Sequence, residues 1–304
     1  MTKRFDGARP VRLAPKAPTV TAQRIVSALL LAIAVASCGE PALFRQDRKL
    51  RIVGQLRSDL LTSAFAERGA VLSITDEQSK ALAAESAADA KRADTTLVEL
   101  RDLVRGDGNE PEKTTLEALE GDWKKLKAFD SGLLELAVKN TNLKAAALLA
   151  RDGRDSTIAF SDGLEGVAKG ISDPATLRTI AKCQTSALRS LALLLLHVPS
   201  EDDAEMSRWE ALIVQRNAEV EAGLEELRKS SVVPASSLDE VARRWTAFRE
   251  VEKQALRLSR ENSNVMSRRA SLDEKPRALE ATLGALDRFE AVVRSSVKTS
   301  NPRR

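Results

Sequence analysis

The chain has 304 residues, of which 30% are charged and only 3% are aromatic. The scarcity of aromatic residues argues against a β-sandwich or barrel, and the abundance of Ala, Leu, Glu, Arg and Lys favours long helices. The one histidine and two cysteines form no spacing typical of a metal site or a c-type haem, so we expect neither a metal nor a cofactor.

The net charge of +4 comes from the first 37 residues, where basic side chains outnumber the acid Asp6: Lys3, Arg4, Arg9, Arg12, Lys16 and Arg24. The remainder of the chain is close to neutral. Because nucleic-acid binding needs a basic surface on the folded part of a protein, we expect no nucleic-acid partner.

Residues 1–37 are typical of a bacterial lipoprotein signal peptide. A basic stretch precedes the apolar run Ile25 to Ser37, which is too short to cross the ~30 Å hydrocarbon core of a membrane. The sequence Val35-Ala36-Ser37-Cys38 resembles a lipobox, which implies cleavage before Cys38 and attachment of acyl chains such as palmitate to that residue. We therefore expect a lipid-anchored, periplasm-facing envelope protein. The alternative is a chance cysteine behind an ordinary signal or an uncleaved anchor.

The residue after the lipobox cysteine is Gly39 rather than Asp, and the resemblance then implies the outer membrane rather than the inner one. Removing Cys38 leaves Cys183 alone, so no intrachain disulfide is expected.

Proline-containing turn signals at Pro111, Pro174 and Pro234 divide the rest of the chain at regular intervals. They predict four helical stretches, at about 41–105, 112–169, 174–230 and 237–295. Four such stretches with short connections predict an all-α fold, an elongated antiparallel up-down-up-down four-helix bundle.

An internal repeat runs through the second and fourth stretches. Leu116, Leu119, Trp123 and Leu126 follow coiled-coil spacing, and the pattern recurs at Leu238, Val241, Trp245 and Phe248. The repeat predicts two equivalent helical hairpins, about 39–152 and 174–276.

Each predicted stretch also contains one interruption, at Ser73 to Asp76, Asp152-Gly153, Pro199 and Pro276. Their similar heights allow either one continuous rod or two stacked modules. The proximal module of the helical bundle 38–304 would then comprise 41–74, 153–198 and 277–296, and the distal module 75–152 and 199–276.

Residues 71–104 (VLSITDEQSKALAAESAADAKRADTTLVELRDLV) and 258–286 (LSRENSNVMSRRASLDEKPRALEATLGAL) resemble the four-helix-bundle sensor domains of methyl-accepting chemotaxis receptors. The two-module layout is similar to the helical bimodular variant of those domains. The resemblance implies a ligand-binding bundle without enzymatic activity.

Four asparagines are candidate ligand-binding or register residues: Asn140 and Asn262 at core-facing positions, and Asn142 and Asn264 beside them. Buried amides either fix helix register or hold a small amino-acid or organic-acid ligand. Trp123 and Trp245 are expected to fill the core, and Glu225-Glu226 to lie on a solvated face.

His197 has no second histidine or cysteine nearby and no evident catalytic partner, so we expect no catalytic and no metal site. The basic residues Arg45, Arg48, Lys49 and Arg51 either contact anionic lipid or form an ordinary helix start.

These features predict a non-enzymatic envelope lipoprotein with a chemoreceptor-like, ligand-binding helical bundle. The alternative is a structural or scaffolding lipoprotein, a helical spacer whose partners are only proteins. Expected partners are the membrane, through the lipid anchor, together with a small ligand, an envelope protein or a second copy of the chain.

Overall fold

The computed structural model describes residues 42–300, so the predicted signal peptide 1–37 and the lipidation residue Cys38 lie outside the described residues. The chain divides into two compact units, 1–48 and 49–304. All regular secondary structure in the described part is helical, which confirms the predicted all-α helical bundle. No helix within this part is both long enough and apolar enough to cross a membrane.

The helices follow in this order, with η marking short π-helical segments: α2 (Ala42–Leu72), α3 (Asp76–Asp107), α4 (Glu110–Lys139), α5 (Thr141–Leu148), η1 (Leu149–Gly153), α6 (Arg154–Ala168), α7 (Pro174–His197), α8 (Asp203–Lys229), α9 (Ala235–Glu261), α10 (Ser263–Arg269), η2 (Ala270–Glu274) and α11 (Lys275–Ser300).

Local sequence explains where these helices begin. The side chains of Thr75, Asn109, Asp173 and Asp202 each accept a hydrogen bond from a backbone N–H in the first turn of the helix that follows. Prolines occupy the first turns of α4 and α7, where the missing N–H costs no intrahelical hydrogen bond. The predicted turns near Pro111, Pro174 and Pro234 are therefore confirmed.

Two of the four predicted stretches are not single helices. The chain reverses direction between α2 and α3, where Ser63 Oγ donates to Ser86 O at 3.0 Å and Ser86 Oγ donates to Ser63 O at 2.9 Å. It reverses again between α7 and α8, where Ser186 Oγ donates to Glu219 Oε2 at 2.7 Å. The predicted up-down-up-down order of four long helices is wrong in this respect, because two of the expected kinks are hairpin turns.

The other two stretches do run on, as α4–α5–η1–α6 and α9–α10–η2–α11. Each changes direction at an asparagine in the left-handed conformation, Asn140 (φ 51°) and Asn262 (φ 47°). The predicted interruption at Asp152-Gly153 falls inside η1, and Pro276 is the second residue of α11, which follows η2. Because proline lacks an N–H, a π-helical segment ahead of Pro276 accommodates the lost backbone hydrogen bond.

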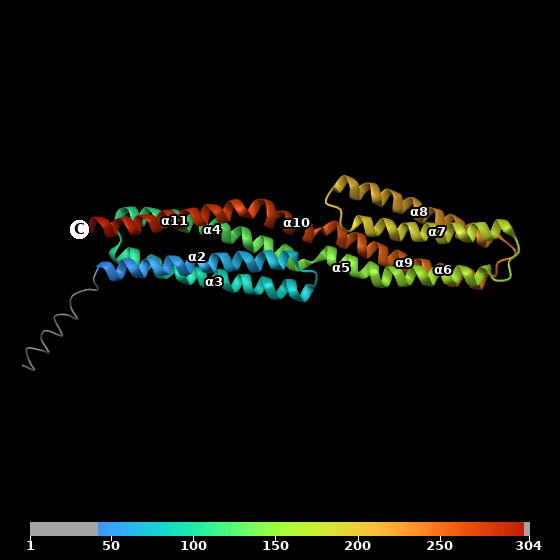
Figure 1. Ribbon diagram of the computed structural model, residues 1–304. Helices are drawn as coiled ribbons and strands as arrows, with labels where there is room; N and C mark the ends of the chain where they lie inside the picture. The colour runs from blue at the N-terminus through green and yellow to red at the C-terminus, as the bar shows by residue number, and fades with distance from the viewer. Residues whose placement is uncertain (1–41, 301–304) are drawn as a thin grey trace, which may run out of the picture. The chain divides into compact units, whose positions relative to one another are not determined.

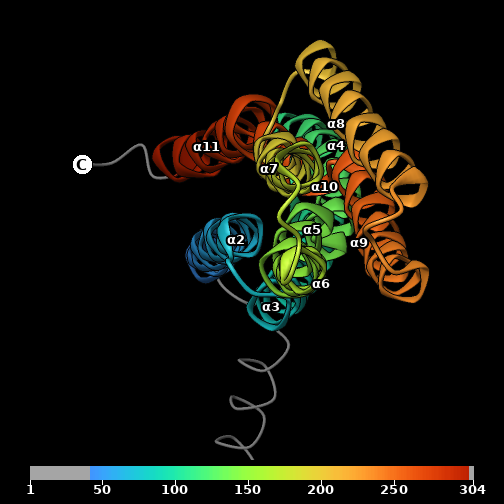
Figure 2. The same cartoon turned by 90° about the vertical axis from the view of Figure 1, so that its right-hand side faces the viewer.

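The apolar side chains gather into two main cores. One is built by α2, α3, α4 and α11 and is called here the first bundle. The other is built by α5 with η1, α6, α7, α8 and α9, and is called the second bundle. Figures 1 and 2 show α9 running alongside α5 and α6, in agreement with their contacts. This grouping differs from the predicted modules, because the hairpin turn at 73–75 keeps α2 and α3 within the first bundle and the turn at 198–202 keeps α7 and α8 within the second.

The internal repeat is wider than a hairpin. Buried residues of α4 recur in α9 in constant register, as with Leu116 and Leu238 or Trp123 and Trp245. Buried residues of α2 and α3 recur in α7 and α8, also in one register: Val53 with Ile180, Leu56 with Cys183, Ser63 with Ser190, Ala93 with Val220, and Leu100 with Leu227. Each repeat contributes three helices to its own bundle, and its last helix packs in the bundle of the other repeat.

Candidate functional site

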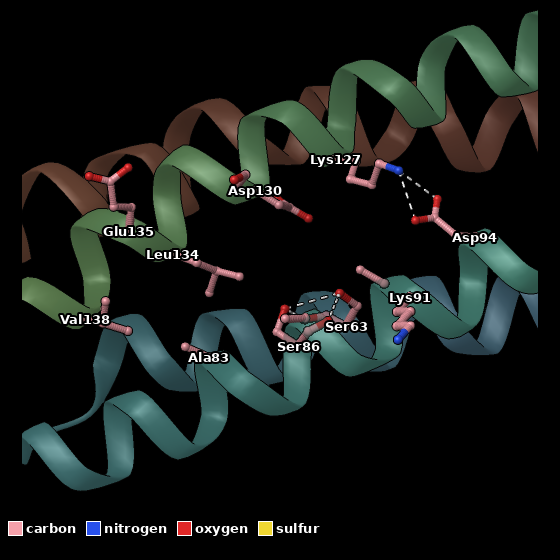
Figure 3. A pocket seen from close by; sticks show the side chains of 13 residues that line it. Ser63, Ala83, Ser86, Lys91, Asp94, Lys127, Asp130, Leu134, Glu135 and Val138 are labelled. Carbon is pink, nitrogen blue, oxygen red and sulfur yellow. Dashed lines mark hydrogen bonds and ion pairs between the residues drawn. The ribbon is translucent and has the colours of Figure 1, made fainter.

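A cavity of about 440 Å³ opens between α2, α3 and α4 of the first bundle (Figure 3). Its walls carry small or apolar side chains, Ala83, Ala87, Ala90, Leu134 and Val138, and three hydroxyls, Ser63, Ser86 and Ser131. Charged side chains also line it: Lys91, Asp94, Lys127, Asp130 and Glu135. A concave site of this size with apolar walls and a few polar groups is typical of small-molecule binding.

At one end of the cavity the charges are paired. Asp94 accepts hydrogen bonds from Lys127 Nζ at 2.9 Å and from the indole Nε1 of Trp123 at 2.8 Å. The indole ring of Trp123 is otherwise buried, as expected for a core residue. Asp94 is therefore neutralised by its own surroundings.

Deeper in the bundle, two carboxylates share one ammonium group. Lys275 Nζ, at the start of α11, lies 2.7 Å from Glu67 Oε2 and 3.0 Å from Asp130 Oδ1. Glu67 and Asp130 are only 1% and 7% exposed, and Lys275 is 3% exposed. Neither Glu67 Oε1 nor Asp130 Oδ1 accepts a well-aligned hydrogen bond within the described residues. Glu67, Asp130 and Lys275, called here the acidic cluster, carry one negative charge in excess when both carboxyls are ionised.

The pKa of Asp130 lies above its ordinary value, mainly because the carboxyl group is buried. The ion pair with Lys275 offsets part of the rise, and the negative charge of Glu67 adds a smaller increase. An ionised carboxylate is costly to bury unless its charge is balanced. Asp130 therefore gains from any positive group that enters the cavity.

Equivalent positions in the second bundle carry different side chains from those at and near the cavity of the first. In the register of the repeat, Glu67, Ser79 and Ser86 of the first bundle correspond to Leu194, Met206 and Ile213, which are fully buried in the second. Of these three residues of the first bundle, Ser86 lines the cavity, and the larger apolar side chain of Ile213 fills the equivalent place in the second bundle. Because equivalent helices of the two repeats surround both places, the cavity results from the side chains of the first bundle rather than from its backbone arrangement.

The buried acid of the second bundle is fully balanced. Glu252, the counterpart of Asp130, accepts two hydrogen bonds from Asn217 Nδ2 at 3.0 and 3.1 Å and one from Ser190 Oγ at 3.2 Å, and it pairs with Arg249. Lys275 has its counterpart in Gly153, where an added Cβ would lie 3.3 Å from the side chains of Leu149 and Leu191. Of Asp130 and Glu252, only Asp130 lines the open cavity and shares its counter-ion with a second carboxylate.

The structure brings the four predicted asparagines together where the two long helical stretches bend. Asn142 Nδ2 donates to Asn262 Oδ1 at 2.8 Å and to Val198 O at 2.8 Å, and Asn264 Nδ2 donates to Asn140 Oδ1 at 2.9 Å. Asn140 Nδ2 donates in turn to Asp76 Oδ1 at 3.0 Å. Their amide groups are thus engaged with other parts of the chain, an arrangement that favours the register interpretation over ligand binding.

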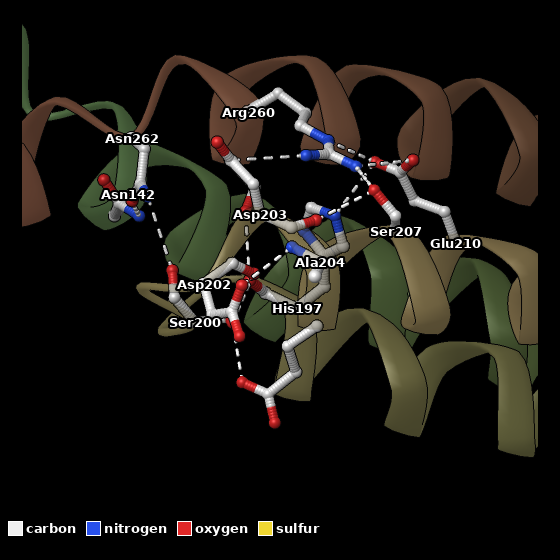
Figure 4. A network of polar contacts seen from close by, with 12 residues as sticks. Asn142, His197, Ser200, Asp202, Asp203, Ala204, Ser207, Glu210, Arg260 and Asn262 are labelled. Atoms are coloured by element: carbon white, nitrogen blue, oxygen red, sulfur yellow. Dashed lines mark hydrogen bonds and ion pairs between the residues drawn. The ribbon is translucent and has the colours of Figure 1, made fainter.

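His197 is fully buried in a network that joins α7, α8 and α9 (Figure 4). Its Nδ1 lies 2.8 Å from Ser259 Oγ, and its Nε2 lies 3.0 Å from Glu210 Oε1, which also accepts from Arg260 Nε at 2.6 Å. The order serine, histidine, acid resembles a hydrolytic triad. However, Ser259 is also fully buried, so a substrate carbonyl could not reach its hydroxyl in this conformation. The network therefore joins the three helices through buried hydrogen bonds.

The remaining candidates have simple surroundings. Lys49 is buried, and its ammonium lies 2.8 Å from Glu112 and 2.9 Å from Asp107, so it is not available to lipid. Glu225 and Glu226 are exposed, as expected for a solvated face. Burial raises the pKa of the Cys183 thiol to about 11. Trp245 is buried against Phe160 and Phe248, as expected for a core residue.

No group of three or more His, Cys, Asp or Glu side chains within the described residues could hold a metal ion. No protein-family model matches the chain, and no curated protein matches it.

Sequence reasoning did not find the acidic cluster, because Glu67, Asp130 and Lys275 come from three distant parts of the chain. A signal was present in the repeat itself. Ser79 and Ser86 occupy positions that hold Met206 and Ile213 in the other copy, so the apolar pattern is interrupted in only one of two equivalent segments.

Proposed function

We propose that the chain is a non-enzymatic lipoprotein of the bacterial envelope, anchored through Cys38, whose helical bundle binds a small molecule in the cavity of the first bundle. One observation carries the proposal: the first bundle has a cavity lined by Ser86, whereas the fully buried Ile213 occupies the equivalent position in the second bundle. Opening a core in this way costs stability, so its presence in one copy favours a use for the space.

The resemblance to chemoreceptor sensor domains supports the same function. In such a bundle, ligands bind between helices, as the cavity between α2, α3 and α4 would allow. We therefore assign the chain a sensor-like role, periplasm-facing and held at the outer membrane by its acyl chains.

A scaffolding lipoprotein is the second candidate, and exposed apolar side chains favour it. Phe65 and Ile74 are each 81% exposed, and Leu72 is 54% exposed, all on or next to the last turns of α2. Apolar side chains of this size on a surface are suited to a protein partner. This surface and the cavity are made by different residues, so the two functions can be tested separately.

The test is a ligand screen on the full chain purified from membranes in detergent. Amino acids, organic acids and amines are added, and thermal unfolding is followed by tryptophan fluorescence. A ligand at about one hundred times its Kd should stabilise the protein by ~2.7 kcal/mol. The variant Ala90→Leu, which fills the cavity, should lose the response, and Ala84→Leu, on the exposed face of the same helix, should keep it. A flat response across the screen would favour the scaffold.

Anchoring is tested by Cys38→Ser. Labelling of cells with radioactive palmitate should be lost in this variant, and the unprocessed precursor should accumulate. Unchanged labelling would show that Cys38 is not the lipidation site.

A further inference from the structure

The acidic cluster and the cavity are parts of one site. Asp130 lines the cavity (Figure 3). It also pairs with Lys275, which in turn pairs with Glu67. The cluster holds two carboxylates against one ammonium, so with both carboxyls ionised it carries a net negative charge at the wall of an open space. A buried, uncompensated carboxylate either takes up a proton or attracts a cation.

The other charged groups around the cavity do not supply that cation. Lys127 is engaged with Asp94 at 2.9 Å, and Glu135 adds a further negative charge, which is paired with Lys139 at 3.4 Å. Lys91 lies at the same end of the cavity as Lys127 and Asp94 and is exposed (Figure 3). The positive side chains that line the cavity are therefore grouped at one end of it.

The walls select the kind of cation. A metal ion such as Ca²⁺ needs six or more oxygen ligands, whereas these walls consist mainly of Ala83, Ala90, Leu134 and Val138. A primary ammonium donates only three hydrogen bonds and brings its own apolar chain. Carboxylate and hydroxyl oxygens at Asp130, Ser63 and Ser86 suit the ammonium head, and the apolar side chains suit an alkyl chain.

We propose that the cavity of the first bundle binds a small aliphatic primary amine, with its ammonium group against Asp130 and its alkyl chain against Leu134, Val138 and Ala83. This inference rests on the proposed ligand-binding function and names the chemical class of the ligand. The amine completes the charge balance of the acidic cluster. In the second bundle Asn217, Ser190 and Arg249 balance Glu252 from within the chain.

The experiment compares three probes with the same alkyl chain, n-butylammonium, butyrate and 1-butanol, on the full chain in detergent at pH 7. Isothermal titration calorimetry gives the affinity of each, and thermal unfolding shows that each variant is folded. We expect binding of n-butylammonium, which Asp130→Asn weakens by about tenfold or more, the equivalent of ~1.4 kcal/mol. The matched control is Glu117→Gln, which removes an exposed carboxylate of the same helix outside the cavity, and the affinity of this variant should change by less than about twofold.

A purely structural role for Asp130 predicts unchanged n-butylammonium affinity in Asp130→Asn. The unfolding temperature does not separate the two roles, because Asp130→Asn removes the excess buried charge and its unfolding temperature should equal or exceed that of the original chain in either case. Unchanged n-butylammonium affinity in Asp130→Asn would overturn the proposal. Equal binding of butyrate or 1-butanol would also overturn the proposal. It would be overturned as well if KCl, added at the same ionic strength as the n-butylammonium salt, displaced n-butylammonium from the protein.

The screen separates this inference from the proposed function. If organic acids stabilise the chain and Ala90→Leu abolishes their effect, the cavity is a ligand site but the amine assignment is wrong. If no amine, acid or neutral probe has an effect, the proposed ligand-binding function fails as well.

Discussion

Asn142 and Asn264 each accept a hydrogen bond from the backbone N–H of the other, at distances of 3.2 and 3.1 Å between nitrogen and Oδ1. Thr141 and Ser263 show the same reciprocity, since the hydroxyl of each accepts from the backbone N–H of the other at 3.1 Å. Equivalent residues of the two repeats thus pair with each other, which places a local two-fold relationship at this crossing. The bends at Asn140 and Asn262 occur directly before these pairs.

We predict that the left-handed asparagines tolerate glycine better than a larger apolar residue. Asn140→Leu should destabilise the fold, because a left-handed backbone costs most L-residues about 1–2 kcal/mol and the buried amide contacts are lost as well. Asn140→Gly should be less damaging by about 1 kcal/mol, since glycine adopts this conformation freely. Urea unfolding of the two variants measures the difference.

Lys139→Leu and Lys139→Gly, one residue earlier in the right-handed helix α4, form the matched pair. There the order should reverse, because glycine is the poorer helix former. If leucine is also the better residue at position 140, the left-handed conformation does not control stability there.

Removal of the shared ammonium should be strongly destabilising. Lys275→Met leaves Glu67 and Asp130 buried side by side without a counter-ion, and breaking a buried ion pair of this kind costs about 3–5 kcal/mol. Adding Asp130→Asn and Glu67→Gln to Lys275→Met should restore much of the loss. The free energy of urea unfolding at pH 7 is the measurement, and a triple variant no more stable than Lys275→Met would contradict this account.

Acidification should weaken the second bundle through His197. Burial lowers the pKa of this imidazole below 6.5, although its hydrogen bond to Glu210 opposes the change. The unfolded chain therefore binds more protons than the folded one as the pH falls below 6.5, and stability falls with it. Glu210 faces the ring from α8, and its pKa is lowered below 4.5, mainly by the hydrogen bond from Arg260. Protonation of Glu210 should therefore destabilise the protein only at a lower pH than protonation of His197.

The comparison is with His197→Gln, which cannot take up this proton. Between pH 7 and pH 5 the unfolding temperature of the original chain should fall more steeply than that of the variant. Parallel curves would show that His197 does not titrate differently on unfolding.

Helices α7 and α8 approach closely at Gly223. A Cβ atom at this position would overlap Cys183 Sγ, so Gly223→Ala should destabilise the second bundle by about 1–3 kcal/mol through overpacking. Cys183→Ala removes the sulfur and should recover part of the loss in the double variant. Thermal unfolding of the two single variants and the double variant measures the coupling, and simple additivity would mean that the two residues do not compete for space.

Sequence alone predicted the all-α fold, the turns near Pro111 and Pro174, and the repeat, because each depends on local residue preferences or on periodic spacing. It did not predict the reversal at Thr75. A residue that caps the start of a helix looks the same in sequence whether the chain has just turned back or has only bent. That choice depends on packing between α2 and α3.

Two further features needed the structure. The spacing placed Asn140 and Asn262 at core-facing positions, but it could not show that both adopt a left-handed conformation and interrupt the helix. The acidic cluster depends on contacts between residues far apart in the chain, and no local pattern joins Glu67 to Lys275.

The exchange of last helices between the repeats gives the chain the anatomy of a swapped dimer within one polypeptide. If the chain were cut in the connection at 169–173, each half would keep three helices of one bundle and a fourth helix that fits only the other half. A single half would then present both an empty slot and the helix that fills such a slot. Two copies of it could close on each other, with Asn142 facing its own symmetry mate. The present chain joins two such subunits covalently. The filled bundle can then offset the stability that the other bundle loses through its open cavity.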